Sequence, residues 1–238
     1  MKSTTSRELV QGLTGPGSSI AVPSIDEQVA RFLASPPDHL SSNSSHENAR
    51  PLFFLLGGGN DVLFNPNITA SRSVQVLLRL KDQLQVAYPE GDFVFLDYPN
   101  FARIPYSFYL SANGGSSDGV SASISKRVLA TFFRELKALY EDVMLDGIRS
   151  STGGLNNMRF VDIMPLFEEF DYYGEPEQYG MDPFGAYGSC LVGVYQETGS
   201  DNVTVCESPD RMAFWDEYHP TTHAHSWVAR RVLDVLGF

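Results

Sequence analysis

Two side chains near the C-terminus, Asp216 and His219, have the types and spacing of an acid–base pair. They stand in Asp216-Glu217-Tyr218-His219-Pro220, just before a stretch with helical periodicity. Since proline suits the first helical position, Pro220 is expected there, with the pair in the turn entering the helix. The Asp216 carboxylate can then reach Nδ1–H of His219 and leave Nε2 to take a proton from a hydroxyl nucleophile. By itself, this spacing is also that of a capping aspartate near a surface histidine.

A second polar group suited to catalysis comes after an apolar run. Gly57-Gly58-Gly59-Asn60-Asp61 stands directly after Pro51–Leu56, which has the pattern of a strand buried on both faces of a parallel sheet. Asn60 is therefore expected at the C-terminal edge of that strand, where its amide can donate a hydrogen bond to a developing oxyanion. The alternative is a tight turn in which Asp61 caps the next segment of the chain.

Together, the two motifs resemble the SGNH, or GDSL-type, esterase and lipase family. Gly58-Gly59-Asn60-Asp61 matches the third block of that family, and Asp216-Glu217-Tyr218-His219-Pro220-Thr221 matches the fifth. The similarity covers most of the chain. Two further segments, 20–29 and 93–99, are most similar to fungal secreted members, the carbohydrate esterase family 16 acetylesterases.

The resemblance implies hydrolysis of carboxylic esters, such as acetyl groups on carbohydrate, by a Ser-His-Asp triad without cofactor or metal. It gives His219 the role of base, Asp216 that of its orienting acid and Asn60 that of oxyanion donor. The family's serine belongs to a Gly-Asp-Ser block on the first strand, and the printed sequence contains no Gly-Asp-Ser. We therefore expect an N-terminally truncated domain that lacks this strand and is inactive as given. The alternative is an inactive relic that binds carbohydrate or acyl-sugar.

Other residues with chemical potential have simpler interpretations. Gly115-Ser116-Ser117-Asp118-Gly119 has the pattern of a nucleophile elbow, but loop residues precede it where a strand is needed. His223 and His225 follow His219 closely, yet no cysteine or carboxylate completes a familiar zinc spacing. Glu168-Glu169 indicates a solvated acidic face rather than paired catalytic acids. Four tyrosines could stack on sugar rings or pack under a long loop: Tyr172, Tyr173, Tyr179 and Tyr187.

The apolar periodicity predicts alternating strands and helices. Helices are expected from residue 25, over 73–86 and 124–145, and from 220 to 236; strands over 51–56, 93–96 and 159–164; and loops over 12–24, 36–50 and 99–119. This order fits a three-layer α/β/α, flavodoxin-like parallel sheet, which places ligands at the C-terminal ends of its strands.

Composition limits the partners. A chain of 238 residues with 42% hydrophobic residues suits one domain. A net charge of -12 without a basic stripe argues against nucleic acid and anionic membrane surfaces, and no apolar run approaches the roughly 20 residues of a membrane span. We expect a monomer that acts on a small-molecule or carbohydrate ester.

Signals for the cellular location disagree. The N-terminus has no apolar h-region, so no signal peptide is predicted in this chain. Three glycosylation sequons (Asn43, Asn67 and Asn202) and one cysteine pair, Cys190 with Cys206, instead favour an extracellular full-length protein. The cysteines flank a segment rich in Gly, Ser, Asp and Asn, which fits a disulfide-closed surface loop; two buried free thiols are the alternative.

Overall fold

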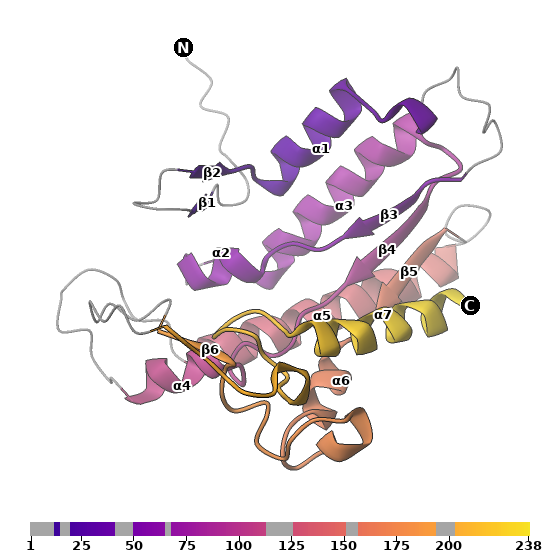
Figure 1. Cartoon of the computed structure of the whole chain (residues 1–238). Helices are drawn as coiled ribbons and strands as arrows, with labels where there is room; N and C mark the ends of the chain where they lie inside the picture. Colours follow the sequence, from indigo (N-terminus) through magenta and orange to yellow (C-terminus); the bar gives the residue numbers. More distant parts are fainter. Residues whose placement is uncertain are drawn as a thin grey trace. The chain divides into compact units, whose positions relative to one another are not determined.

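The structure, a computed structural model of the 238-residue chain, falls into two compact units (Figure 1). It describes residues 12–14, 20–40, 50–64, 68–112, 126–150, 157–193 and 203–238. The first unit comprises Met1–Leu96 and Glu135–Phe160, and the second comprises Asp97–Arg134 and Val161–Phe238. The single SGNH domain expected from the sequence stays a prediction.

A three-stranded parallel sheet in the order β3-β4-β5 lies in the first unit and confirms the α/β fold class. Its strands are β3 (Leu52–Leu55), β4 (Asp92–Leu96) and β5 (Met158–Val161), whose last residue belongs to the second unit. Leu52 pairs with Asp92, and Leu55 with Phe95. Helix α3 (Ala70–Ala87) connects β3 to β4 as predicted and buries Val76, Leu77, Leu80 and Leu84.

Two helices of the first unit, and the part of a third that begins at Glu135, contact one face of this sheet. Helix α1 (Ile25–Ala34) begins after Ser24, as predicted, and the backbone N–H of Ser24 donates to the Glu27 carboxylate at 3.0 Å. Residues of α1, α3 and α5 (Lys126–Ser150) touch strand residues that alternate along the chain and so share a face. The pairs are Phe32 with Phe53, Lys81 with Phe93, and Tyr140 with Phe95.

The prediction that Pro51–Leu56 is buried on both faces is wrong. Three alternate residues are exposed, at 42%, 51% and 46%: Leu52, Phe54 and Leu56. Leu55 between them is only 4% exposed, so one face of β3 is covered and the other is open. Among the described residues, β3 is an edge strand. The central residues of β4 do have the predicted double burial.

The second unit contains several short elements. They are α4 (Pro105–Ala112), α6 (Met164–Glu169), α7 (Thr222–Leu236), the antiparallel pair β6 (Leu191–Val192) and β7 (Thr204–Val205), and the 3-10 turns η3 (Pro176–Tyr179) and η4 (Pro209–Arg211). The prediction of irregular structure over 99–119 is wrong for α4. Its sequence, PYSFYLSA, is apolar or aromatic at most positions, so no helical period is visible in it.

Smaller differences occur elsewhere. The expected loop at 12–24 contains an antiparallel pair, β1 (Gly12–Thr14) with β2 (Ile20–Val22), and the one at 36–50 contains the 3-10 turn η2 (Asp38–Leu40). The short helix α2 (Gly59–Phe64) follows β3. The third strand ends at Val161, because Met164-Pro165 opens α6.

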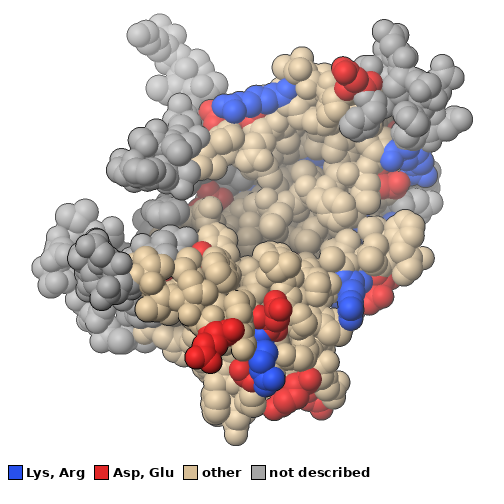
Figure 2. Space-filling view, in the orientation of Figure 1, with Lys and Arg blue, Asp and Glu red and all other residues tan. Residues whose placement is uncertain are grey.

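Negative charge gathers in the second unit, at the end of α6 and on the segment that follows it (Figure 2). Its exposed acids are Glu168, Glu169, Glu175 and Glu177. The four exposed glutamates account for part of the acidic character of the chain.

Among the described residues, no helix is both long and apolar enough to cross a membrane.

Candidate active site

The structure brings Asp216 and His219 into direct contact in the loop before α7. His219 Nδ1 lies 2.8 Å from Oδ2 and 2.9 Å from Oδ1 of Asp216. Asp216 Oδ1 also accepts hydrogen bonds from the backbone N–H groups of Tyr218 and His219, at 2.8 and 2.7 Å. The carboxylate thus orients both the loop and the ring. Since 67% of the His219 side chain is exposed, an external group can approach the imidazole.

The surroundings of Asp216 keep it ionised. Burial opposes its charge, but hydrogen bonds from Tyr218 N–H, the His219 ring and His219 N–H outweigh that effect and lower the pKa of Asp216. A carboxyl with a lowered folded-state pKa stabilises the fold above its unfolded pKa, and that stabilisation is lost as the pH falls through the folded-state pKa. At neutral pH, Asp216 is therefore an anion that favours the Nδ1–H tautomer of His219.

Helix α4 holds the other side of this loop. The N–H of Tyr106 donates to the carbonyl of Glu217 at 3.0 Å, and the rings of Tyr106 and Tyr218 lie 4.4 Å apart. These contacts position the residues between Asp216 and His219. No signal in the sequence links Tyr106 to Tyr218, because the two residues are far apart in the chain and α4 has no visible period.

A buried acid holds the residues that lead into α4. Asp171 accepts hydrogen bonds from Arg103 and from the hydroxyl of Tyr187, the latter at 2.5 Å. Burial and the Asp171 charge raise the pKa of Tyr187 to about 12, so this hydroxyl stays a donor. Burial opposes the charge of Asp171, but Tyr187, Tyr173 N–H and Arg103 together lower its pKa. The network connects Asp171, through Arg103, to the helix that contacts the acid–base loop.

Glu217, between the two members of the pair, is 2% exposed. Its Oε1 is buried without a hydrogen-bond partner. Burial, with a smaller contribution from the Asp216 charge, raises the pKa of Glu217. A buried acid of this kind is costly when ionised.

We expect Glu217→Gln to increase the free energy of unfolding at neutral pH. The raised folded-state pKa means that the contribution of Glu217 is fully present below its unfolded pKa, about 4.3, and is lost as the pH rises through the folded-state value. Urea denaturation between pH 4 and pH 8 should show this decline in the parent chain and a weaker one in Glu217→Gln. Exposed Glu207→Gln is the matched control. Equal pH profiles for the parent and Glu217→Gln would contradict the prediction.

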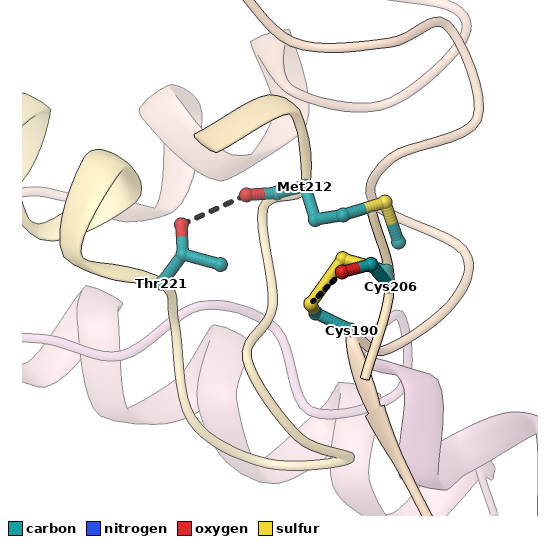
Figure 3. Close-up of a disulfide and its surroundings, with 4 residues drawn as sticks. All are labelled: Cys190, Cys206, Met212 and Thr221. Carbon is teal, nitrogen blue, oxygen red and sulfur yellow. Dashed lines mark hydrogen bonds between the residues drawn. A yellow bond between two sulfur atoms is a disulfide. The ribbon is translucent and has the colours of Figure 1, made fainter. Parts of the chain in front are cut away.

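Helix α7 begins at Thr222, two residues after Pro220. Thr221 is its N-cap, and Thr222 is its first residue, so the prediction of Pro220 at the first helical position is wrong. The hydroxyl of Thr221 accepts from Ala224 N–H at 3.1 Å and donates to the carbonyl of Met212 at 2.8 Å (Figure 3). One side chain therefore starts the helix and fixes it to the preceding segment. A threonine before an apolar periodic stretch is a recognisable cap signal.

Thr221→Val is expected to reduce the free energy of unfolding by about 1–3 kcal/mol, because it removes the cap and leaves the Met212 carbonyl without this donor. Thr221→Ser, which keeps the hydroxyl, should be close to the parent. Thermal unfolding followed by circular dichroism measures the difference. An unchanged free energy of unfolding in Thr221→Val, which keeps the methyl group and lacks only the hydroxyl, would contradict the prediction.

Cys190 and Cys206 form a disulfide (Figure 3). Beside it, Cys190 N–H donates to the carbonyl of Phe214 at 3.1 Å, and Leu191 N–H to that of Trp215 at 2.6 Å. Trp215 N–H in turn donates to the carbonyl of His219 at 2.7 Å. The disulfide loop is thus bonded to the two residues that precede Asp216.

The glycine-rich segment, by contrast, belongs to the first unit. Gly59 opens α2, exposed Asn60 follows it, and Asp61 is buried. Gly58 has φ = 107°, a conformation that favours glycine. A Cβ on Gly57 would lie 3.2 Å from a methyl carbon of Leu77, so a side chain there would crowd α3. The oxyanion role of Gly58-Gly59-Asn60-Asp61 stays a prediction.

The remaining candidates separate into packed and external groups. Tyr179 packs on Phe170 and Trp227, whereas Tyr172 and Tyr173 are 49% and 87% exposed. His223 Nε2 lies 2.6 Å from the carbonyl of Tyr179, and His225 Nδ1 lies 3.0 Å from that of Thr221. Within the described ranges, no three His, Cys, Asp or Glu side chains form a group that could hold a metal ion. The three predicted glycosylation sites, Asn43, Asn67 and Asn202, lie outside those ranges, as does Ser117 of the rejected nucleophile-elbow pattern.

Comparison with known proteins adds one relative. No family model matches the sequence. A stretch of 98 residues is 29% identical to GDSL esterase/lipase LTL1 of Arabidopsis thaliana. The match supports the GDSL esterase/lipase family. It covers 40% of this chain and only 26% of the length of the Arabidopsis protein.

The second unit supplies an acid and a base in contact, together with the α4 and disulfide-loop contacts that hold them. The comparison does not extend to the carbohydrate esterase family 16 acetylesterases or to any substrate, because it reaches the GDSL family alone. The activity of the whole protein therefore remains to be proposed from the site.

Proposed function

We propose that the protein is a carboxylic ester hydrolase. Asp216 and His219 would be the acid and the base of its Ser-His-Asp triad. The observation that carries the proposal is the contact of His219 Nδ1 with both carboxylate oxygens of Asp216, at 2.8 and 2.9 Å. The GDSL match supports the same reaction class. No cofactor is needed for this chemistry.

In the proposed reaction, His219 Nε2 takes the proton from a serine Oγ–H while that oxygen attacks the ester carbonyl carbon. The side-chain amide of Asn60 donates a hydrogen bond to the oxyanion that forms. The imidazolium then protonates the departing alcohol oxygen, leaving an acyl-enzyme. Water, deprotonated by His219, then attacks the acyl carbon; the imidazolium protonates the departing serine Oγ, which releases the carboxylic acid and restores the serine and the neutral histidine.

The substrate that we propose is a short acyl ester on carbohydrate, such as an acetyl group. The motifs at 20–29 and 93–99, which resemble carbohydrate esterase family 16 acetylesterases, support this choice. We further propose that the full-length protein is secreted and glycosylated. The disulfide and the three sequons support that location.

Hydrolysis of p-nitrophenyl acetate tests the function. We expect the printed chain to be no faster than its His219→Ala variant, because it contains no Gly-Asp-Ser serine. A form extended by the in-frame coding sequence upstream of Met1 is expected to hydrolyse the ester if it supplies that block. His219→Ala should then reduce its kcat at least about a thousandfold.

Two outcomes would overturn the proposal. Hydrolysis by the printed chain that disappears in His219→Ala would show that the nucleophile is not the serine of a Gly-Asp-Ser block. An extended form with Gly-Asp-Ser whose activity is unaffected by His219→Ala would remove His219 from the mechanism. Binding of an acetylated oligosaccharide without turnover by either form would favour the inactive relic.

A further inference from the structure

The second unit contains a cavity of about 530 Å³ between α6 and the C-terminal half of α7. Its volume lies within the roughly 300–1,000 Å³ of small-molecule sites. His219 is not among its lining residues. Trp227, Arg230 and Asp234 line it from positions three and four residues apart, which share one face of α7.

The charged groups of the cavity are balanced. Arg230 and Arg231 face the same space as Glu169 and Asp234. The Arg230 guanidinium lies 4.3 Å over the Trp227 ring, and Arg231 Nε donates to the carbonyl of Asp162 at 3.4 Å. Among the described residues, neither arginine forms an ion pair with either carboxylate. Side chains of opposite charge thus line one open cavity without pairing with each other, and all four are exposed to solvent.

The walls between these charges are apolar and held in place. Pro165, Leu166 and Leu233 contribute aliphatic surface. The rings of Tyr179 and Trp227 meet edge to face at 5.0 Å, and Trp227 Nε1–H donates to the carbonyl of Tyr179 at 3.2 Å. Burial and the charges of two glutamates raise the pKa of Tyr179, so its hydroxyl remains a donor at neutral pH.

We propose that this cavity binds a neutral sugar ring. A ligand with no net charge suits two arginines opposite two carboxylates, and hydroxyl groups both donate and accept, so they can satisfy guanidinium and carboxylate together. The C–H faces of a pyranose suit the aliphatic and aromatic walls. A simple anion would meet two carboxylates, and a simple cation two guanidiniums. The assignment is independent of ester hydrolysis, since it uses none of the residues proposed for that reaction.

Tryptophan fluorescence provides a local test because the chain contains only Trp215 and Trp227. Trp215→Phe makes Trp227 the sole tryptophan and alters no lining residue. We expect the emission of this variant to change saturably with at least one of three neutral probes: cellohexaose, xylohexaose or mannohexaose. Adding Asp234→Ala should raise the Kd at least about tenfold, because a hydrogen bond to a charged acceptor is lost.

Two further variants, also made in Trp215→Phe, complete the design. Asp210→Ala removes an exposed carboxylate outside the cavity, and His219→Ala removes the proposed base; both should leave the Kd unchanged. Circular dichroism checks that each variant is folded. The proposal would be overturned if no probe gave a saturable change, or if folded Asp234→Ala bound the sugar with the same affinity. It would also be overturned if the emission responded only to hexanoate, an aliphatic anion without a sugar ring. Loss of binding in His219→Ala would place the sugar at the acid–base pair instead.

Discussion

In Asp216→Asn, His219 is expected to lose its preference for the Nδ1–H tautomer. The asparagine Oδ1 can still accept from the backbone N–H groups of Tyr218 and His219, so the loop can keep its shape. Its amide NH₂ would instead face Nδ1 and donate to it, which moves the ring proton to Nε2. In an extended form with the triad serine, kcat should then fall about 10⁴-fold, because Nε2 can no longer act as the base.

Nitrogen-15 NMR of labelled histidine measures the tautomer directly, even in a chain without activity. Asp210→Asn is the matched control, since Asp210 is an exposed aspartate in η4. The control should give the parent spectrum for His219. An unchanged tautomer in folded Asp216→Asn would mean that the carboxylate does not orient the ring.

Loss of the disulfide should produce the second large effect. Cys190→Ala with Cys206→Ala is expected to reduce the free energy of unfolding by about 3 kcal/mol, the loop-entropy value for a closed loop of about 15 residues. The change should also reach the acid–base loop, because Cys190 and Leu191 donate to Phe214 and Trp215. Amides of 213–219 should exchange faster in the variant, as measured by hydrogen–deuterium exchange.

The oxidised and reduced parent chains provide the comparison for this variant. The reduced parent should match the double variant, and a reductant should leave the double variant unchanged. Faster exchange confined to the disulfide loop, with 213–219 unchanged, would show that the hydrogen bonds to Phe214 and Trp215 transmit nothing to the site.

Local patterns predicted the elements that place the acid and the base. The last helix is visible because its apolar residues recur at helical spacing, and the cysteine pairing because the chain has only two cysteines. Helix α4 was not predicted because most of its own residues are apolar or aromatic, which hides any helical period. The open face of β3 was missed because an apolar run such as Pro51–Leu56 does not reveal which of its faces is covered.

The environment of the pair depends on contacts between distant residues. Tyr106 reaches Tyr218 across more than a hundred residues, and the burial of Glu217 results from tertiary packing that no local pattern encodes. Spacing can therefore indicate which residues carry the chemistry. It cannot indicate what orients them or raises the pKa of a neighbouring acid.

The open face of β3 has a consequence for handling the protein. The uncharged run Pro51–Leu56 combines exposed apolar side chains with an edge strand, which is the kind of segment through which copies self-associate into aggregates. The net charge of -12 opposes such contact through repulsion between copies. High ionic strength screens this repulsion, and a pH near the isoelectric point of about 4.7 abolishes it. Dilute, low-salt solutions near neutral pH should therefore keep the chain dispersed.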